Sequence, residues 1–181
     1  MKLKFKTIFL DRDGVINHDY GYISHWKDFH FIDRALEALQ IISKKKINII
    51  IITNQSGIAR GFYKIKDYEE LTFNFKKFCF SNKINIQDIY YCPHHPLGKI
   101  KEFSLECSCR KPMPGMIFKA INENKKDIKN SALVGDKISD IKAGISAGIK
   151  NNFLIKTTIN KKNDPKYLLI NNLYELTELL V

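Results

Sequence analysis

The sequence predicts an α/β protein built on a central parallel sheet, and three observations support this prediction. First, short apolar runs alternate with segments whose apolar residues follow the helical period, as in parallel sheets covered by helices. Second, Ile47–Thr53 is apolar almost throughout, which is typical of a strand buried on both faces. Third, 181 residues suit one domain, and the connection between the first two expected strands leaves no room for an inserted cap domain. We therefore expect one Rossmann-like three-layer domain over residues 1–181.

The first half of the chain is expected to hold three strands and two helices. Lys4–Leu10 is expected to form the first strand. Asp33 is suited to cap a helix whose apolar residues recur at helical spacing and which ends near the lysines 44–46. Next in order we expect a strand, a helix and a strand: Ile47–Thr53, Asp67 to about Asn82, and Ile86–Tyr91.

The second half of the chain continues the alternation. Pro114 is well placed in the first turn of a helix that runs to about Asn124, because a proline there loses no helical hydrogen bond. The remaining elements are expected to be a strand, a helix, a strand, a polar surface loop and a helix: Ala132–Val134, Ser139–Ala147, Asn152–Ile155, Asn160–Lys166 and Leu173–Leu180.

The composition favours a small anionic substrate over a polyanion or a membrane. The net charge is +11, but 26 lysines and only 4 arginines carry the positive charge, and the lysines are scattered along the chain. Because arginine is the better reader of bases and phosphates, nucleic acid is not expected to be the main partner. No run of 18 apolar residues exists, and residues 1–5 do not resemble a secretion signal. We expect a cytoplasmic protein.

Two carboxylates stand directly after the first expected strand. Side chains two residues apart on a strand point the same way, so Asp11 and Asp13 are expected to project together from its carboxyl end. Ligands of open α/β sheets bind at this edge. Two like charges this close repel unless a cation lies between them, and Mg²⁺ suits carboxylates that also meet phosphate. The alternative is an ordinary solvated Asp-Gly turn.

Three further polar segments follow expected strands and so reach the same edge. The segment Thr53–Gly57 offers a hydroxyl and backbone donors suited to phosphoryl oxygens. Lys111 supplies a cation that would neutralise charge on a transferred phosphoryl group. Asp136 would complete an oxygen shell for Mg²⁺, and Asp140, one helical turn on, would support it. The loop Asn17–Phe31 is expected to border the site, since no inserted domain covers it.

A cysteine-rich loop over about residues 92–109 predicts a zinc site. Cys92, Cys107 and Cys109 lie in it with two neighbouring histidines, His94 and His95. Three thiolates and one imidazole form a tetrahedral structural zinc site, and a disulfide is not expected in a cytosolic protein. The spacing alone leaves open which histidine is the ligand. The fourth cysteine, Cys79, is expected to be a buried core thiol.

Taken together, the motifs resemble those of the haloacid dehalogenase superfamily, over nearly the whole chain. The resemblance is closest to its small sugar-phosphate phosphatases without a lid, a group that includes heptose bisphosphate and histidinol phosphate phosphatases. It is carried by four strings: DRDGVIN (11–17), TNQSGIARG (53–61), CRKPMPGM (109–116) and GDKISDIKAG (135–144).

The resemblance implies a role for each site residue. Asp11 would be the nucleophile, Asp13 the general acid and base, and Thr53 and Lys111 the groups that hold the phosphoryl oxygens. Mg²⁺ would be held by Asp11, the backbone carbonyl of Asp13, and Asp136; Zn²⁺ would be held by Cys92, His94, Cys107 and Cys109. Substrate contacts are implied for Asp19, Tyr20, Gly21, Tyr22, Asn54, Gln55, Ser56, Arg110 and Lys137.

The leading functional expectation is Mg²⁺-dependent removal of the C7 phosphate of D-glycero-D-manno-heptose 1,7-bisphosphate by a monomeric enzyme, in the synthesis of heptose units for surface polysaccharide. Histidinol phosphate is the alternative substrate. A DNA 3′-phosphatase and a zinc-containing nucleic-acid-binding module without catalysis are further alternatives. The module would need clustered arginines and exposed stacking aromatics, neither of which is clear in the sequence.

Overall fold

A parallel sheet of six strands forms the centre of the described chain. The computed structural model describes residues 3–157 and 164–181. The strands lie in the order β3-β2-β1-β4-β5-β6, and every neighbouring pair is parallel, which confirms the predicted fold class. Their bounds are β1 Thr7–Leu10, β2 Asn48–Asn54, β3 Ile86–Cys92, β4 Ser131–Gly135, β5 Asn151–Ile155 and β6 Leu168–Ile170.

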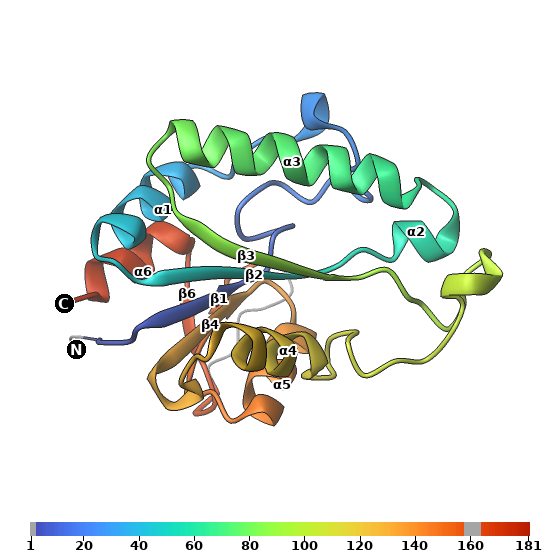
Figure 1. Ribbon diagram of the computed structural model, residues 1–181. Coiled ribbons are helices and arrows are strands. Elements are labelled where there is room, and N and C mark those ends of the chain that lie inside the picture. Colours follow the sequence, from blue (N-terminus) through green and yellow to red (C-terminus); the bar gives the residue numbers. More distant parts are fainter. Residues whose placement is uncertain (1–2, 158–163) are drawn as a thin grey trace.

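Helices cover both faces of the sheet and complete the three layers (Figure 1). One face packs against α1 (Ala35–Lys44), α3 (Ile65–Ser81) and α6 (Leu173–Leu179). The other face packs against α4 (Gly115–Asn124) and α5 (Ile138–Ala147). A short helix, α2 (Gly57–Arg60), follows β2, and three 3₁₀ turns cover Trp26–Asp28, Lys101–Phe103 and Ile128–Asn130.

The strand side chains alternate between the two helical layers. In β2, Ile49 and Ile51 join the core that contains α1, α3 and α6, whereas Ile50 and Ile52 join the core that contains α4 and α5. All four are at most 1% exposed. Since each face of the strand is covered, nearly every residue must be apolar, which explains the continuous apolar run in the sequence.

All strands point toward one edge of the sheet. In Figure 1 the described chain ends lie on the left, whereas α2 and the loop after β3 lie on the right, beyond the carboxyl ends of β2 and β3. Residues that directly follow β1, β2 and β4 therefore meet at this edge, as predicted.

The connection from β1 to β2 contains only a loop, one 3₁₀ turn and α1 among the described residues, which confirms that no cap domain is inserted there. An aromatic cluster attaches this loop to α3. The Phe29 ring lies 5.3 Å from that of Phe75, between ring centroids, and 5.1 Å from that of Phe31. No helix in the described part of the chain is long and apolar enough to cross a bilayer.

The structure corrects two expected helix starts. Asp33 does not cap α1: Arg34 stands at the N-cap with φ = 60° and no side-chain cap, and its guanidinium instead pairs with Glu37 at 3.0 Å. Asp67 does not begin α3, which starts at Ile65; the Asp67 carboxylate accepts a hydrogen bond from the Lys64 amide, at 2.8 Å. Both errors arise because an aspartate near a helix start suits several positions of the first turn.

Two short elements were not predicted, α2 and β6. They have four and three residues, too few to display a period. Most of the expected surface loop over 160–166 lies outside the described residues. That residues 1–181 form one domain stays a prediction.

We predict that Phe75→Ala will lower the free energy of unfolding by about 3–5 kcal/mol, because the change empties a fully buried site between α3 and the 17–31 loop. Phe80→Ala on the same helix removes a ring that is 85% exposed, and is expected to change the free energy of unfolding by no more than about 0.5 kcal/mol. Urea denaturation measures both. Equal losses in the two variants would contradict the packing described.

Candidate active site

A cavity of about 590 Å³ opens at the carboxyl edge of the sheet, and all four sequence motifs contribute to its wall. The four expected catalytic residues line it: Asp11, Asp13, Thr53 and Lys111. Of the nine expected substrate contacts, eight line it as well: Asp19, Gly21, Tyr22, Asn54, Gln55, Ser56, Arg110 and Lys137. The exception is Tyr20, whose side chain is 65% exposed and stacks on His18 instead.

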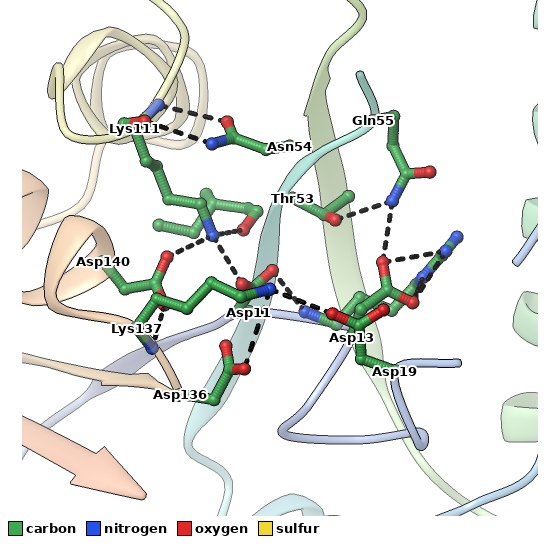
Figure 2. A network of polar contacts seen from close by, with 12 residues as sticks. Asp11, Asp13, Asp19, Thr53, Asn54, Gln55, Lys111, Asp136, Lys137 and Asp140 are labelled. Carbon is green, nitrogen blue, oxygen red and sulfur yellow. Dashed lines mark hydrogen bonds and ion pairs between the residues drawn. The ribbon is translucent and has the colours of Figure 1, made fainter. Parts of the chain in front are cut away.

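Three buried carboxylates form the acidic centre of the site. One oxygen from each of Asp11, Asp136 and Asp140 lies within 4.8 Å of the others (Figure 2). Burial raises the pKa of Asp11 to about 7, although Lys111 opposes the shift, and the neighbouring carboxylates raise it further. Burial likewise raises the pKa of Asp136 to about 6, against the opposing charge of Lys137. A hard divalent cation would remove this repulsion, so the oxygen donors present fit Mg²⁺.

Two glycines allow the carboxylates to approach so closely. Gly14 has φ = +86°, and a Cβ atom on it would collide with the carboxylate of Asp136. A Cβ atom on Gly135 would collide with the side chain of Asp140. Any other residue at either position would displace a member of the acidic centre.

Lys111 is the buried cation of the centre. Its Nζ lies 2.9 Å from Asp11 Oδ2 and 2.8 Å from Asp140 Oδ1, and it donates to the carbonyl of Ile52 at 2.9 Å. Burial acts to lower the pKa of this ammonium, but the two carboxylates outweigh burial and raise it. Lys111 therefore stays charged, and its three protons all face acceptors. A phosphoryl oxygen that binds Lys111 must replace one of them.

Asp13 is held apart from the acidic centre. Its carboxylate accepts hydrogen bonds from Arg12 Nη2 at 2.9 and 3.0 Å, from Asn17 Nδ2 at 2.9 Å and from Gln55 Nε2 at 3.0 Å (Figure 2 shows the Gln55 contact). The side chain of Asp13 is thus oriented by three neighbours, away from the carboxylates that would share a metal. Its assignment as a metal ligand concerned the backbone carbonyl and stays a prediction.

The mouth of the cavity carries charges from three loops. Lys137 Nζ lies 3.0 Å from Asp19 Oδ2, which joins the loop after β1 to the start of α5. Burial alone would raise the pKa of Asp19, but the hydrogen bond and charge of Lys137 lower it. Arg110 donates to the carbonyl of His94, at 3.2 Å, and also lines the cavity.

Sequence reasoning missed four residues of the cavity wall: Arg60, Tyr63, Pro112 and Ser139. Arg60 lies 2.9 Å, Nη2 to Nε2, from His95, and so connects α2 to the loop after β3. The one available signal was that Arg60 falls inside the string TNQSGIARG. Tyr63 lies beyond that string, and nothing in the sequence marked it. Pro112 and Ser139 fall inside the strings CRKPMPGM and GDKISDIKAG, and Asp140, which was expected to support the metal site, also lines the cavity.

The cysteine-rich loop brings its expected zinc ligands together. The Sγ atom of Cys109 lies 3.1 Å from that of Cys92 and 3.2 Å from that of Cys107, and His94 Nδ1 lies 3.3 Å from Cys109 Sγ. These four residues form a cluster compatible with a metal ion, whereas His95 turns to Arg60. Hydrogen bonding from Cys92 lowers the pKa of Cys109 to about 5, which favours the thiolate that binds metals. Three thiols and an imidazole fit Zn²⁺.

Comparison with known proteins gives consistent relatives. Residues 7–166 match the family described as polynucleotide kinase 3 phosphatase. The chain is 45% identical to the D-glycero-alpha-D-manno-heptose-1,7-bisphosphate 7-phosphatase of Photorhabdus laumondii over 179 residues, 98% of this chain and 97% of the relative. It is 45% identical to the D-glycero-beta-D-manno-heptose-1,7-bisphosphate 7-phosphatase of Haemophilus influenzae over 152 residues, 84% of this chain and 82% of the relative.

A solved structure agrees with these sequence relatives. The crystal structure of a D,D-heptose 1,7-bisphosphate phosphatase from B. bronchiseptica, complexed with magnesium and phosphate, superposes with a TM-score of 0.83 at 26% identity, covering 96% of each chain.

We predict that the purified protein holds about one zinc ion per chain and that Cys107→Ala loses it. Because structural zinc supplies on the order of 10 kcal/mol to ordering its peptide, the melting temperature should fall by roughly 5 °C or more. Elemental analysis and calorimetry measure the two quantities. Cys79→Ala removes a buried thiol outside the loop, and it should keep the zinc. An unchanged melting curve after zinc removal would contradict a structural role.

Proposed function

The chain belongs to the polynucleotide kinase 3 phosphatase family, and on that premise we propose that it removes the C7 phosphate of D-glycero-D-manno-heptose 1,7-bisphosphate. It is a phosphoric monoester hydrolase with a haloacid-dehalogenase-like fold. The heptose substrate is supported by relatives at 40–45% identity that carry this activity in their names.

The observation that carries the proposed reaction is the pairing of buried Asp11 with buried Lys111 beside two further carboxylates. A nucleophilic carboxylate must remain anionic while it approaches an anionic phosphate, and Coulomb repulsion opposes that approach. Lys111 supplies a fixed positive charge 2.9 Å from the nucleophile. Such a preorganised charge costs no rearrangement when negative charge develops on the phosphoryl group.

In the first step an Asp11 oxygen attacks the phosphorus of the C7 phosphate. The new bond joins Asp11 to phosphorus, the bond from phosphorus to the sugar oxygen breaks, and Asp13 donates a proton to that oxygen. Thr53 and Lys111 bind the transferred phosphoryl oxygens. In the second step water attacks phosphorus and gives a proton to Asp13; the bond from phosphorus to the Asp11 oxygen breaks, inorganic phosphate is released, and both the Asp11 carboxylate and protonated Asp13 are restored.

Mg²⁺ would be held by Asp11, the backbone carbonyl of Asp13, and Asp136. When bound, it neutralises charge between the nucleophile and the phosphate. The Asp140 carboxylate accepts a hydrogen bond from the backbone N–H of Lys137 at 2.9 Å and also pairs with Lys111. Its proposed role is therefore to position Lys111.

Cations at the mouth of the cavity are suited to a second phosphate. Arg110 follows the zinc ligand Cys109 directly and is fixed by the carbonyl of His94. We assign it to the distal phosphate of the bisphosphate, with Lys137 and Asp19 at the sugar. Histidinol phosphate has no distal phosphate and would leave Arg110 without an anionic partner, which favours the heptose. We propose that the product is used to make the heptose units of surface polysaccharide. The enzyme is proposed to be cytoplasmic and monomeric.

A panel of phosphate esters tests the proposal. Phosphate release is measured with both anomers of D-glycero-D-manno-heptose 1,7-bisphosphate, with histidinol phosphate and with a 3′-phosphorylated oligonucleotide, each with and without Mg²⁺. We expect the heptose bisphosphates to have the highest kcat/KM, and only with Mg²⁺. A preference for histidinol phosphate or for the oligonucleotide would contradict the proposed substrate, but it would agree with the proposed hydrolysis of a phosphate ester.

We predict that Asp11→Asn will lower kcat at least about 1,000-fold, because an amide is a poor nucleophile toward phosphorus. Asp33→Asn makes the same chemical change at an exposed carboxylate that does not line the cavity, and is expected to keep the wild-type rate. Undiminished hydrolysis by Asp11→Asn would remove the assigned nucleophile.

A further inference from the structure

We propose that Tyr63 is a positioning residue that fixes the side-chain amide of Gln55, and through it both Asp13 and Thr53. The inference rests on the proposed function, because Asp13 and Thr53 are two of its reacting groups. It changes the expected role of Gln55, from contacting the substrate to orienting its neighbours.

The contacts form a continuous chain. The hydroxyl of Tyr63 donates to Gln55 Oε1 at 2.5 Å. Gln55 Nε2 donates to Asp13 Oδ2 at 3.0 Å and to Thr53 Oγ1 at 2.8 Å (Figure 2 shows the last two). Gln55 and Thr53 are at most 2% exposed and Tyr63 is 7% exposed, so water competes little for these bonds.

The chemistry of the partners determines which way the amide faces. The two carboxylate oxygens of Asp13 already accept hydrogen bonds from Arg12 and Asn17, and the NH₂ end of Gln55 faces Asp13 as a further donor. The carbonyl end then faces Tyr63, whose hydroxyl is able to donate. Burial raises the pKa of Tyr63, which keeps the hydroxyl protonated and able to donate. Without this donor, the carbonyl end of Gln55 would lose the one side-chain partner that it has among the described residues.

This orientation has a direct consequence for Thr53. Both amide hydrogens of Gln55 are in use, one of them on the Thr53 oxygen. Because that oxygen already accepts, the hydroxyl hydrogen of Thr53 is available to a different acceptor. Thr53 lines the cavity, so a phosphoryl oxygen is suited to be that acceptor. The same amide supplies one of the donors that hold the Asp13 carboxylate.

The local fold explains how Tyr63 reaches Gln55. α2 ends at Gly61 in the left-handed region, with φ = +75°, and the chain then turns back toward β2. Gly57 leaves room for the tyrosine ring, since a Cβ atom there would collide with it. The ring belongs to a small buried cluster with Ile58 and Tyr68. Phenylalanine would keep this packing and remove only the hydroxyl.

We predict that Tyr63→Phe will lower kcat about tenfold, the effect of one buried hydrogen bond of ordinary strength, and leave KM within about twofold. Tyr68→Phe is the matched control, because Tyr68 is a neighbouring buried tyrosine whose hydroxyl bonds to no active-site residue in the described structure. It should keep the wild-type kcat. A Tyr63→Phe protein that turns over at the wild-type rate would overturn the inference.

A double-mutant cycle separates positioning from general loss of stability. If Tyr63 acts through Gln55, then Tyr63→Phe should have little further effect on kcat once Gln55→Leu is present. Fully additive losses would overturn the inference.

A readout without substrate distinguishes this inference from the proposed function. The Gln55 side-chain NH₂ signals in the ¹⁵N NMR spectrum should be protected from exchange in the wild type and in Tyr68→Phe, and lose protection in Tyr63→Phe. Unchanged protection in Tyr63→Phe would overturn the hydrogen-bond chain. Wild-type protein that shows the protection but hydrolyses none of the panel would contradict the proposed function alone.

Discussion

Mutual repulsion among buried carboxylates is the constraint around which this molecule is organised. Asp11 and Asp136 follow the neighbouring strands β1 and β4, and Asp140 lies in the first turn of α5; one oxygen from each lies within 4.8 Å of the others, where water screens them poorly. Lys111 relieves part of the repulsion, and a divalent cation would relieve the rest. The surrounding backbone keeps the carboxylates close together. Gly14 and Gly135 leave room for them, and the register of β1 with β4 fixes the separation of the residues that follow these two strands.

The fold could be predicted because burial on both faces of a parallel strand leaves a clear record in the sequence. Ile49 to Ile52 face two different cores, and only a continuous apolar run satisfies both. Helix starts were harder, since Asp33 and Asp67 both suit a cap but neither has that position. The four-residue α2 has no detectable period, although it carries Arg60 to the cavity.

The site could be predicted as a set of residues but not as a set of orientations. Residues that follow parallel strands must meet at one edge, so Asp11, Thr53 and the late aspartates could be grouped from their places after strands, whereas Lys111 lies beyond the whole cysteine-rich loop after β3 and was grouped with them by its motif. Which way each side chain turns depends on partners distant in sequence. Gln55 is held by a hydrogen bond from Tyr63, and His95 contacts Arg60 while His94 lies with the cysteines, a choice that the spacing alone had left open. No local pattern records such competition.

The short connection after β1 has a consequence for how the enzyme selects its substrate. The loop that borders the cavity is fastened to α3 by Phe29, Phe31 and Phe75, and no hinged body spans the opening in the described chain. Enzymes with such a body couple recognition to a closing movement, which often limits turnover. Here the rim residues of the cavity are the groups that the described chain offers for discrimination, and the cavity is open to bulk water in this structure. Water is the second reactant of the proposed hydrolysis, so for this chemistry an open vestibule is an advantage.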